Sequence, residues 1–508
     1  MQPKKFDAIV IGSGLGGLSC GAYLAKNGRK VLILEKHSMP GGYATNFRRG
    51  DFVFDSTLHM VDGVGKGQTM RKFLEQCNVA EKIEYLKLKH FARLIFPEHD
   101  IRLPCGDLEG VIAVLEKNFP LEKERIRRLF KKLVKIHDDI FRFVLSSAPM
   151  WQQLPVFPFR YRALFPALKK TVGELLGKHL NDDKLKALLW ANWGFFGLPI
   201  SKLNVVSVFA NIDYWMLGAY YPKGGSQMVS NAFVDVIEQD GGEVVLNTEV
   251  ASIIVESGEA VGVMTKKGEK YLAKNIISNA CAIDTFNSLV GREKLPPKFV
   301  AKMDRMEPCV SVLSVHLGLD EDFRSTLKDN EDYEIIVSDT YDPDRDYQWC
   351  INCDVEHASF FLTLYSNIED TFAKDNKFVI GITQGQNYDY WEKYEKDYFA
   401  GNKKEYNKEK ERIARLLIKR AEKVVPGLSE HIEVMEVATP LTLKRYTGNF
   451  NGSLYGWAET VNQFTPMDRM TSVPIKNLYL SSAWTFPGGG QMSVIACGYR
   501  LGRQLIGR

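Results

Sequence analysis

Phe6-Asp-Ala-Ile-Val-Ile-Gly-Ser-Gly-Leu-Gly-Gly17 is the stretch of sequence on which the fold depends. Its first six residues form a short β-branched apolar run, which is typical of a buried parallel strand. Residues 18–27 then have the small and apolar composition of a packed helix, which Gly28 ends. Val31–Leu34 is a second buried strand, followed at once by Glu35. The sequence therefore predicts a complete βαβ unit within about 30 residues.

The glycines of this unit have the spacing of a dinucleotide-binding loop. Gly12 permits the tight turn after the strand, Gly14 lets the backbone approach a pyrophosphate, and Gly17 lets helix and strand pack closely. The helix N-terminus supplies free N–H groups and the positive end of the helix dipole. Glu35 can accept hydrogen bonds from an adenosine ribose and would repel a 2′-phosphate. We therefore predict a dinucleotide site that disfavours NADP.

Two further glycine-rich segments favour FAD over NAD. Gly41 and Gly42, with the Thr45 hydroxyl three residues on, can bring backbone N–H groups to the same phosphates. Phe486-Pro-Gly-Gly-Gly490 precedes a predicted final helix over residues 491–505 and offers a second helix N-terminus near the other end of the chain. A flavin dinucleotide is long enough to contact both segments. A simple turn is the alternative interpretation of the second segment.

The nucleotide-binding signals lie at both ends of the chain, so we expect interleaved domains rather than sequential ones. The predicted fold class is α/β, with a Rossmann-type FAD-binding domain interleaved with a mixed α+β substrate domain. We assign the FAD-binding domain to residues 1–65, 220–300 and 435–508. Residues 66–219 are predicted to form a mostly helical region that contacts substrate or membrane, and residues 301–434 the sheet and helices of the substrate domain.

Composition excludes several other classes of protein. The chain has 508 residues, and 66 basic against 62 acidic residues leave a net charge of +4, which is too balanced for a nucleic-acid binder. No apolar run reaches the ~18 residues of a transmembrane helix, and the first residues leave no room for a signal peptide. Eight cysteines and nine histidines form no metal-ligand pattern, so we expect no metal. The expected location is cytoplasmic and peripheral to a membrane.

These motifs together resemble a family of FAD-dependent enzymes. The resemblance rests on the segments Gly12–Gly17, Glu35, Gly41-Gly42, Phe54-Asp55, Tyr221–Gly225 and Thr485–Gly490. They are similar to those of bacterial-type phytoene desaturases, carotenoid cis–trans isomerases and retinol saturases, within the flavin amine-oxidase type of fold. The match covers both ends and the middle of the chain, and residues 66–220 and 300–430 match more loosely.

The resemblance implies roles for further residues. Glu35 would hold the ribose, Val250 would offer backbone contacts to adenine, and the segment from residue 488 to 492 would lie against the ribityl chain and the flavin ring. The named residues of that segment are Gly488, Gly489, Gly490 and Met492. The chain departs from the family where Ser482-Ala483 replaces Gly-Asp, whose carboxylate holds the ribityl hydroxyls. It departs again where Thr57 replaces the glycine of an Asp-x-Gly turn.

Catalysis on a carbon–carbon bond needs an acid or base beside the flavin. His59 is the first candidate, because it closes the strand after the second glycine pair, and a packed neutral histidine is the alternative. Tyr220 and Tyr221 are further candidates, although aromatic pairs commonly pack. The chain carries no second Rossmann fingerprint, so electrons are expected to pass to or from a quinone, oxygen or a redox protein, or FAD acts without net redox change.

The segment from Ile140 to Gly173 contains no Asp or Glu but is rich in aromatic and basic residues. This pattern suits the interface of an anionic bilayer, and relatives take long apolar substrates from membranes. A core-packing segment or a dimer contact is the alternative. We therefore expect an oxidoreductase acting on CH–CH groups that saturates or desaturates C=C bonds of a lipophilic polyene or isoprenoid of retinoid or carotenoid type. The alternatives are a redox-neutral carotenoid isomerase using reduced FAD and a non-catalytic lipid-binding flavoprotein.

Overall fold

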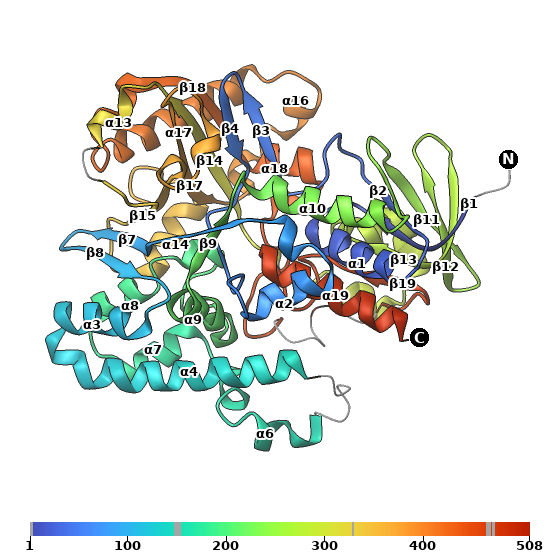
Figure 1. The fold of residues 1–508 in the computed structure, drawn as a ribbon, viewed down its shortest axis with the longest axis horizontal. Helices are drawn as coiled ribbons and strands as arrows, with labels where there is room; N and C mark the ends of the chain where they lie inside the picture. The colour runs from blue at the N-terminus through green and yellow to red at the C-terminus, as the bar shows by residue number, and fades with distance from the viewer. Residues whose placement is uncertain (1–3, 147–153, 328–329, 464–468, 470–472, 508) are drawn as a thin grey trace.

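The computed structural model describes residues 4–146, 154–327, 330–463, 469 and 473–507, and two sheets organise them (Figure 1). In spatial order the first sheet contains β10 (Glu243–Val245), β2 (Val31–Leu34), β1 (Lys4–Ile11), β13 (Lys270–Ser278), β12 (Glu259–Thr265) and β11 (Val250–Glu256), and β19 (Leu478–Leu480) also pairs with β13. β10, β2, β1, β13 and β19 are parallel, whereas β12 and β11 form an antiparallel extension. Three distant parts of the chain thus share one sheet, and the predicted α/β fold with its N-terminal βαβ unit is confirmed.

Helices cover both faces of the first sheet. One face is covered by α1 (Leu15–Lys26), α10 (Ser226–Gln239) and α19 (Gln491–Ile506), and the other by α11 (Ala282–Asp284), a π-helix over Thr285–Gly291 and α12 (Pro297–Met303). Ala8 and Val10 of β1 pack on the first side and Ile9 and Ile11 on the second. Burial on both faces explains why this strand is apolar without alternation.

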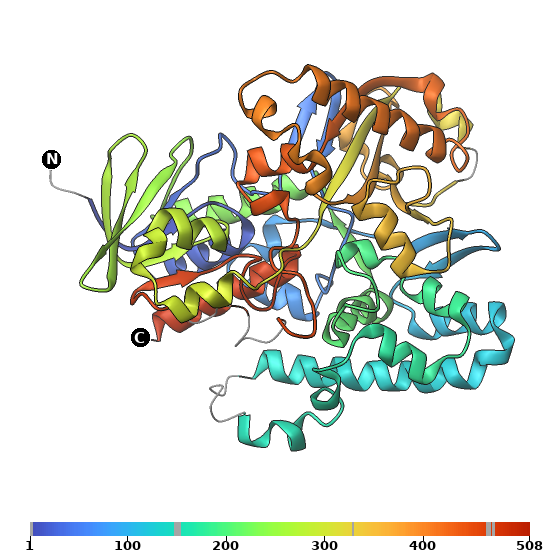
Figure 2. The same ribbon diagram turned by 180° about the vertical axis from the view of Figure 1, so that it is seen from behind.

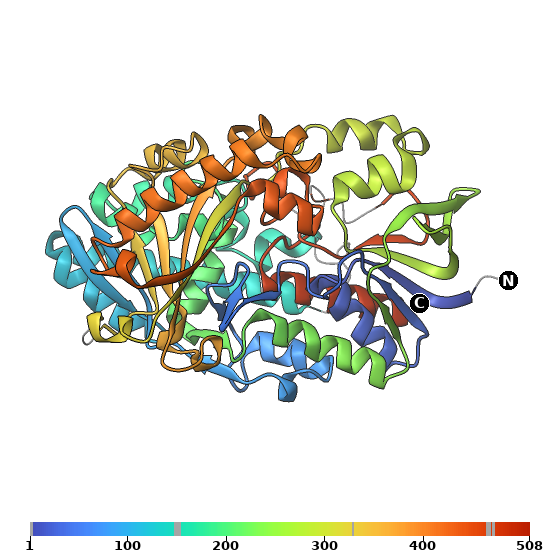
Figure 3. The ribbon, with the colours of Figure 1, turned by 90° about the horizontal axis from the view of Figure 1, so that it is seen from above.

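The close packing of α1 depends on glycines that approach other backbones. A Cβ on Gly17 would lie 2.8 Å from the Gly12 carbonyl oxygen and 2.9 Å from Val10 Cγ1, so only glycine lets α1 lie against β1. On the opposite side of α1, a Cβ on Gly498 of α19 would collide with the Gly16 carbonyl oxygen and lie 2.8 Å from the Cys20 nitrogen. The two ends of the chain are therefore joined by backbone contact, and Figure 3 shows both termini beside the first sheet.

The second sheet lies at the other end of the molecule (Figure 3). In spatial order it contains β18 (Ile432–Ala438), β14 (Ser311–Leu319), β17 (Phe378–Gln386), β16 (Phe360–Leu364), β15 (Glu334–Val337), β7 (His90–Phe96) and β8 (His99–Pro104). Only the β15–β7 pair is parallel. Helix α17 (Lys404–Ala421) packs Ile413, Leu417 and Ile418 against this sheet (Figure 2).

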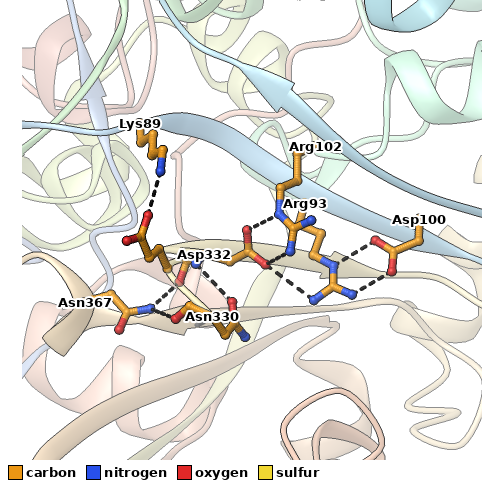
Figure 4. Close-up of polar contacts among 8 residues, drawn as sticks. Lys89, Arg93, Asp100, Arg102, Asn330, Asp332 and Asn367 are labelled. Carbon is orange, nitrogen blue, oxygen red and sulfur yellow. Dashed lines mark hydrogen bonds and ion pairs between the residues drawn. The ribbon is translucent and has the colours of Figure 1, made fainter. Parts of the chain in front are cut away.

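Strands β7 and β8 come from the region that the sequence predicts as mostly helical. Figure 4 shows how polar contacts attach them to the second sheet. Arg102 donates to Asp332 at 2.7 Å, and Arg93 contacts the same carboxylate at 3.4 Å while forming a paired contact with Asp100 at 2.6 and 2.7 Å. Asp332 is only 3% exposed, so the two arginines supply the charge that its burial requires.

The helical region lies beneath the two sheets in the view of Figure 1. It contains α3 (Leu108–Asn118), α4 (Lys123–Leu145), α6 (Phe157–Arg160), α7 (Val172–His179), α8 (Asp183–Leu189) and α9 (Val208–Leu217), whereas α2 (Thr69–Gln76) lies against α19. Two small sheets pair β3 (Asn46–Arg49) with β4 (Phe52–Asp55), and β9 (Ala219–Pro222) with β5 (Val61–Asp62) and β6 (Tyr85–Lys87). Further short helices are α13 (Phe323–Thr326), α14 (Pro343–Ile351), α15 (Asp389–Glu392), α16 (Glu395–Phe399) and α18 (Pro440–Thr447). Within the described ranges, no helix has the length and apolarity needed to cross a membrane.

The contact between α1 and α19 can be tested with two matched Gly→Ala variants. Gly498 lies in α19, and Gly177 lies in α7, where no atom lies within 4 Å of the position that an added methyl group would take. Gly177→Ala should raise the free energy of unfolding by about 0.5–1 kcal/mol, because alanine favours a helix. Gly498→Ala should instead lower it by about 1–3 kcal/mol through overpacking. Denaturant titration measures both, and equal behaviour of the two variants would contradict the contact.

Candidate functional site

A cavity of about 880 Å³ runs between the first sheet, the C-terminal glycines and the helical region. Its volume is in the range of ligand sites, and it begins at the carboxyl ends of parallel strands β1 and β2, where α/β sheets bind their ligands. The lining includes Gly12–Gly16, Glu35, His59, Phe195 and Met492, and α17, α18 and β18 contribute further residues. By the chemistry of this lining, the cavity has two different portions.

The first portion is a cradle of backbone at the N-terminus of α1. Gly14 caps the helix without any side-chain cap, and no acidic residue occupies the first turn. Gly41 bridges to Gly14 as an isolated parallel pair, so the second glycine segment lies directly on the first. A Cβ on Gly14 would lie 2.5 Å from Asn279 Oδ1, and Gly12 has φ +89°. This surface can accept a pyrophosphate because it offers N–H groups and excludes side chains.

Gly17 stands apart from the other two glycines of the fingerprint. It is absent from the cavity lining, and its neighbours are β1 and Asn279. Its position agrees with the packing role expected from the sequence.

Glu35 is buried at the edge of the cradle and is held by the chain itself. Its Oε2 accepts hydrogen bonds from the Ser13 N–H and hydroxyl, both at 2.7 Å, and its Oε1 accepts from the His37 N–H at 2.8 Å. Each carboxylate oxygen can accept more than one bond. Glu35 therefore lines the cavity oriented and still able to receive a ribose hydroxyl. Ser13, which sequence reasoning missed, lies inside the fingerprint itself.

Val250 and Thr45 flank the same portion. Val250 begins β11 and lines the cavity together with Thr248, whose N–H donates to the Glu35 carbonyl at 2.7 Å. Thr45 also lines the cavity, but its hydroxyl already donates to the Gly42 carbonyl at 3.2 Å. The hydroxyl thus shapes the glycine turn in this structure.

The C-terminal glycines form the far wall of the cradle. Gly489, Gly490 and Met492 line the cavity, whereas Gly488 does not, because it lies against Arg469. A Cβ on Gly489 would lie 2.5 Å from Tyr455 Cβ, and Gly490 caps α19 without a side-chain cap. The end of this wall also carries an unpaired polar atom, since the Gln491 side-chain oxygen is buried with no partner among the described residues.

Ser482 and Ala483 line the cavity where the resembling family carries an aspartate. Glu459, which the sequence analysis did not identify, supplies a carboxyl to the same wall. It accepts from the Ser207 hydroxyl at 2.5 Å and lies 3.7 Å from Arg469, and burial raises its pKa. No motif surrounds this residue, so only the folded chain identifies it.

The other departure from the family pattern is resolved by a side chain. Asp55 accepts from the N–H groups of Thr57 and Leu58 at 3.3 and 3.1 Å, which closes the turn without a glycine. Its second oxygen accepts from the Tyr221 hydroxyl at 2.9 Å and the Ser226 N–H at 2.7 Å. The buried carboxylate thus joins β4 to the start of α10.

His59 lines the cavity, and its ring centroid lies 5.4 Å from that of Phe195, another lining residue. Its Nδ1 is 3.1 Å from Glu334 Oε1 and 2.9 Å from the Thr363 hydroxyl, and its side chain is 13% exposed. The Tyr333 hydroxyl donates to its carbonyl at 2.6 Å. A carboxylate at Nδ1 favours the tautomer with a proton on that nitrogen. Among the described residues nothing is hydrogen-bonded to Nε2, so this atom can exchange a proton with a ligand.

The structure does not bring Tyr220 and Tyr221 to the cavity. Tyr221 is fully buried among Tyr333, Tyr365 and Phe372 and is held by Asp55. The Tyr220 hydroxyl donates to the Leu217 carbonyl at 3.3 Å. Both tyrosines pack and stabilise, which was the alternative to an acid/base role.

The second portion of the cavity is mostly apolar. It is lined by Ile140, Phe141, Phe195, Phe196, Phe209 and Tyr214. These residues come from α4, the loop before α9, and α9 itself. An apolar chamber that opens from a dinucleotide cradle can position a lipophilic molecule beside the reactive end of a flavin.

The site fits FAD. The cradle excludes any Cβ at Gly14, Gly41 and Gly489, two uncapped helix N-termini face it, and Glu35 stands at the ribose end. When bound, FAD supplies the transfer of electrons to or from a substrate, and this chain supplies binding, orientation and proton exchange. Within the described ranges, no group of three or more His, Cys, Asp or Glu side chains has the arrangement of a metal site.

Fold and site together define a dinucleotide-dependent flavoprotein. The family model for flavin containing amine oxidoreductases matches residues 15–373, and the chain belongs to that family. Its cofactor is FAD, and it is an FAD-dependent oxidoreductase by family.

Named relatives and solved structures extend this result. The chain is 28% identical to prolycopene isomerase of Daucus carota, over 99% of this chain and 81% of that protein. It is 23% identical to the all-trans-retinol 13,14-reductase of Danio rerio, over 94% of this chain and 82% of that protein. Putrescine oxidase bound to putrescine shares the fold, with a TM-score of 0.65 at 12% identity over 99% of each chain. An oxidoreductase from Methanosarcina mazei has the same TM-score of 0.65, at 16% identity over 97% of this chain and 99% of that one.

Glu35→Gln tests the ribose end of the cradle. The amide cannot accept from Ser13 and His37 as the carboxylate does, so FAD affinity should fall by about tenfold, the effect of losing one charge-assisted hydrogen bond. Titration of the apoprotein with FAD, followed by flavin fluorescence, measures the change. Glu238→Gln, on the exposed side of α10, is the matched control and should bind FAD as the unchanged protein does. Equal affinities for the two variants would contradict the assignment.

Proposed function

We propose that this protein adds or removes hydrogen at a C=C bond of a lipophilic polyene or isoprenoid, as an oxidoreductase acting on CH–CH groups. The observation that carries the proposal is that the FAD cradle, His59 and the apolar residues of α4 and α9 all line one cavity. The names of the relatives support the substrate class, since both prolycopene and all-trans-retinol are polyenes. The electron partner that completes the cycle is a quinone, oxygen or a redox protein.

His59 is the proposed acid or base of this reaction. Saturating a C=C bond requires a proton donor beside the cofactor, and desaturating one requires an acceptor. Glu334 and Thr363 hold Nδ1, and Phe195 and Phe361 pack against the imidazole at centroid distances of 5.4 and 5.6 Å. The ring is thereby fixed at the boundary of the apolar portion. His316, which also lines the cavity, is kept neutral because burial lowers its pKa to about 4.

A redox-neutral isomerase is the second candidate. The relative at 28% identity is named an isomerase, and the same cavity would bind its substrate. Isomerisation returns a product of unchanged mass, whereas saturation or desaturation changes it by two hydrogens. The two candidates therefore differ in one measurable quantity.

The reaction can be tested with purified protein carrying reduced or oxidised FAD, incubated without oxygen with all-trans-retinol or prolycopene. A product two hydrogens heavier with reduced FAD, or two lighter with oxidised FAD, supports the proposal. A mass-identical isomer formed only with reduced FAD replaces it by the second candidate. If the protein neither binds nor converts any polyene, both candidates are contradicted.

His59→Gln, in the same assay, should lower kcat by about 100-fold or more while the FAD content stays unchanged. Glu334→Gln should have an intermediate effect because it disturbs only the orientation of the ring. Full turnover by the His59→Gln variant would show that His59 is not the acid or base of the reaction.

We also propose that an anionic membrane surface is the source of the substrate. Val156, Phe159 and Phe165 are 44%, 74% and 49% exposed, and the exposed Arg160 and Arg162 lie among them. Other aromatic residues of the acid-free segment, such as Tyr161, are buried, and Trp151 lies outside the described residues. Exposed aromatic side chains among cations match the apolar and anionic layers of a bilayer interface.

Two observations connect this surface with the cavity. Arg128, Lys131, Lys135 and Arg142 are exposed along α4 and extend the positive charge. Ile140 and Phe141, near the C-terminal end of the same helix, line the cavity. A lipid entering beside this end of α4 would reach the apolar portion directly.

The double variant Phe159→Ser with Phe165→Ser tests the membrane surface. Sedimentation with vesicles containing phosphatidylserine should show at least about a tenfold loss of binding, because each buried aromatic contributes about 1.5–3 kcal/mol. Leu121→Ser is the control, since Leu121 is 97% exposed but precedes the opposite end of α4. Unchanged vesicle binding by the double variant would contradict the proposal. If the variant instead lost the ability to form dimers but still bound vesicles, this surface would be a dimer contact.

A further inference from the structure

The apolar portion of the cavity contains one polar region that neither the FAD cradle nor His59 uses. Asp62 ends β5, Asp213 lies in α9, and both line the cavity. Helix α9 contacts β5, so the two carboxyls interact. Asp213 is connected to α4 through His137, whose ring centroid lies 4.6 Å from that of Phe141, another residue of the cavity lining.

Asp213 has a partner within the protein. His137 of α4 places Nε2 2.8 Å from Asp213 Oδ1, and both side chains are buried. Burial acts to lower the pKa of His137, but the hydrogen bond and charge of Asp213 raise it above its ordinary value. The pair therefore holds a proton between an imidazole and a carboxylate and satisfies most of its own charge.

Asp62 has no such partner. It is 8% exposed, and no described residue is hydrogen-bonded to its carboxyl. Burial, together with the nearby charge of Asp213, raises the pKa of Asp62 well above its ordinary value. A buried carboxyl without a partner costs free energy, so this group is kept neutral and remains available to a ligand. A neutral carboxyl offers an O–H donor and a carbonyl acceptor in the same plane.

We propose that Asp62 binds the oxygen of a hydroxyl or carbonyl group on an otherwise apolar substrate and so determines its specificity. This inference rests on the proposed function, because it concerns the same cavity and the same class of polyene. Most of the residues that line this portion are apolar, such as Ile140, Phe141 and Phe209, so we expect most of the ligand there to be hydrocarbon. Burial raises the pKa of Asp213 as well, so this region disfavours a further negative charge such as a ligand carboxylate, and a pure hydrocarbon would leave Asp62 unsatisfied.

Three ligands with one carbon skeleton test this assignment: all-trans-retinol, the hydrocarbon in which a methyl group replaces CH2OH, and all-trans-retinoate. Affinities are measured by quenching of tryptophan fluorescence, which requires no turnover. The FAD-loaded protein should bind the alcohol about tenfold more tightly than the hydrocarbon, as one hydrogen bond to a buried group predicts, and should bind the carboxylate more weakly than the alcohol.

Asp62→Leu should abolish the preference for the alcohol while leaving FAD content and hydrocarbon affinity unchanged, and Asp62→Asn should retain part of it. Asp235→Leu, at an exposed site on α10, is the control and should keep the full preference. Equal binding of alcohol and hydrocarbon by the unchanged protein, or an undiminished preference in Asp62→Leu, would overturn the inference. If the leucine variant fails to fold, the three-ligand series and the Asp62→Asn variant still test whether Asp62 binds the oxygen of the ligand. Binding of no polyene at all would overturn the proposed function as well, and the two failures are thus distinguishable.

Discussion

The approach of α1 to two other backbones, at Gly17 on the strand side and at Gly498 on the helix side, is the constraint on which the site depends. Neither contact leaves room for a side chain. Because α19 follows directly after Gly490, its contact with α1 also places the C-terminal glycines opposite the N-terminal fingerprint. Two helix N-termini, contributed by opposite ends of the chain, therefore face one cavity. A dinucleotide with a long reach and two phosphates fits this arrangement.

The reactive part of the site depends on a second long-range contact. His59 belongs to the segment that leaves the first sheet, but Glu334 and Thr363 belong to β15 and β16 of the second sheet. These strands are held to β7 and β8 by the Asp332 contacts, so the second sheet orients the imidazole from outside the FAD-binding domain. The helical region completes the cavity by supplying its apolar lining. The three parts thus differ chemically, since one forms the FAD cradle, one orients His59 and one supplies an apolar lining, which under the proposed function encloses a lipophilic substrate.

Much of the fold could be predicted because its signals are local. A few adjacent residues are enough to predict each of four features, and the structure places these features together. They are the βαβ unit, Glu35, the Gly41-Gly42 pair and the final helix. The strands β7 and β8 form a local hairpin that the sequence analysis missed, and β15, which joins this hairpin to the second sheet through β7, lies more than two hundred positions further on. Tyr220 and Tyr221 were candidate acid/base residues, but the Tyr220 hydroxyl donates to the Leu217 carbonyl and the Tyr221 hydroxyl donates to Asp55. Asp62, Asp213, Glu334 and Glu459 carry no motif, and only the folded chain gathers them at the cavity.

A crystal structure of the protein with FAD and all-trans-retinol would show directly where this cavity holds the cofactor and the polyene. We expect the pyrophosphate between the start of α1 and Gly41, and the flavin ring between Gly489 and His59. We expect the polyene in the portion lined by Phe195 and Phe209. A flavin ring directed away from His59, or a polyene bound outside this cavity, would contradict these assignments.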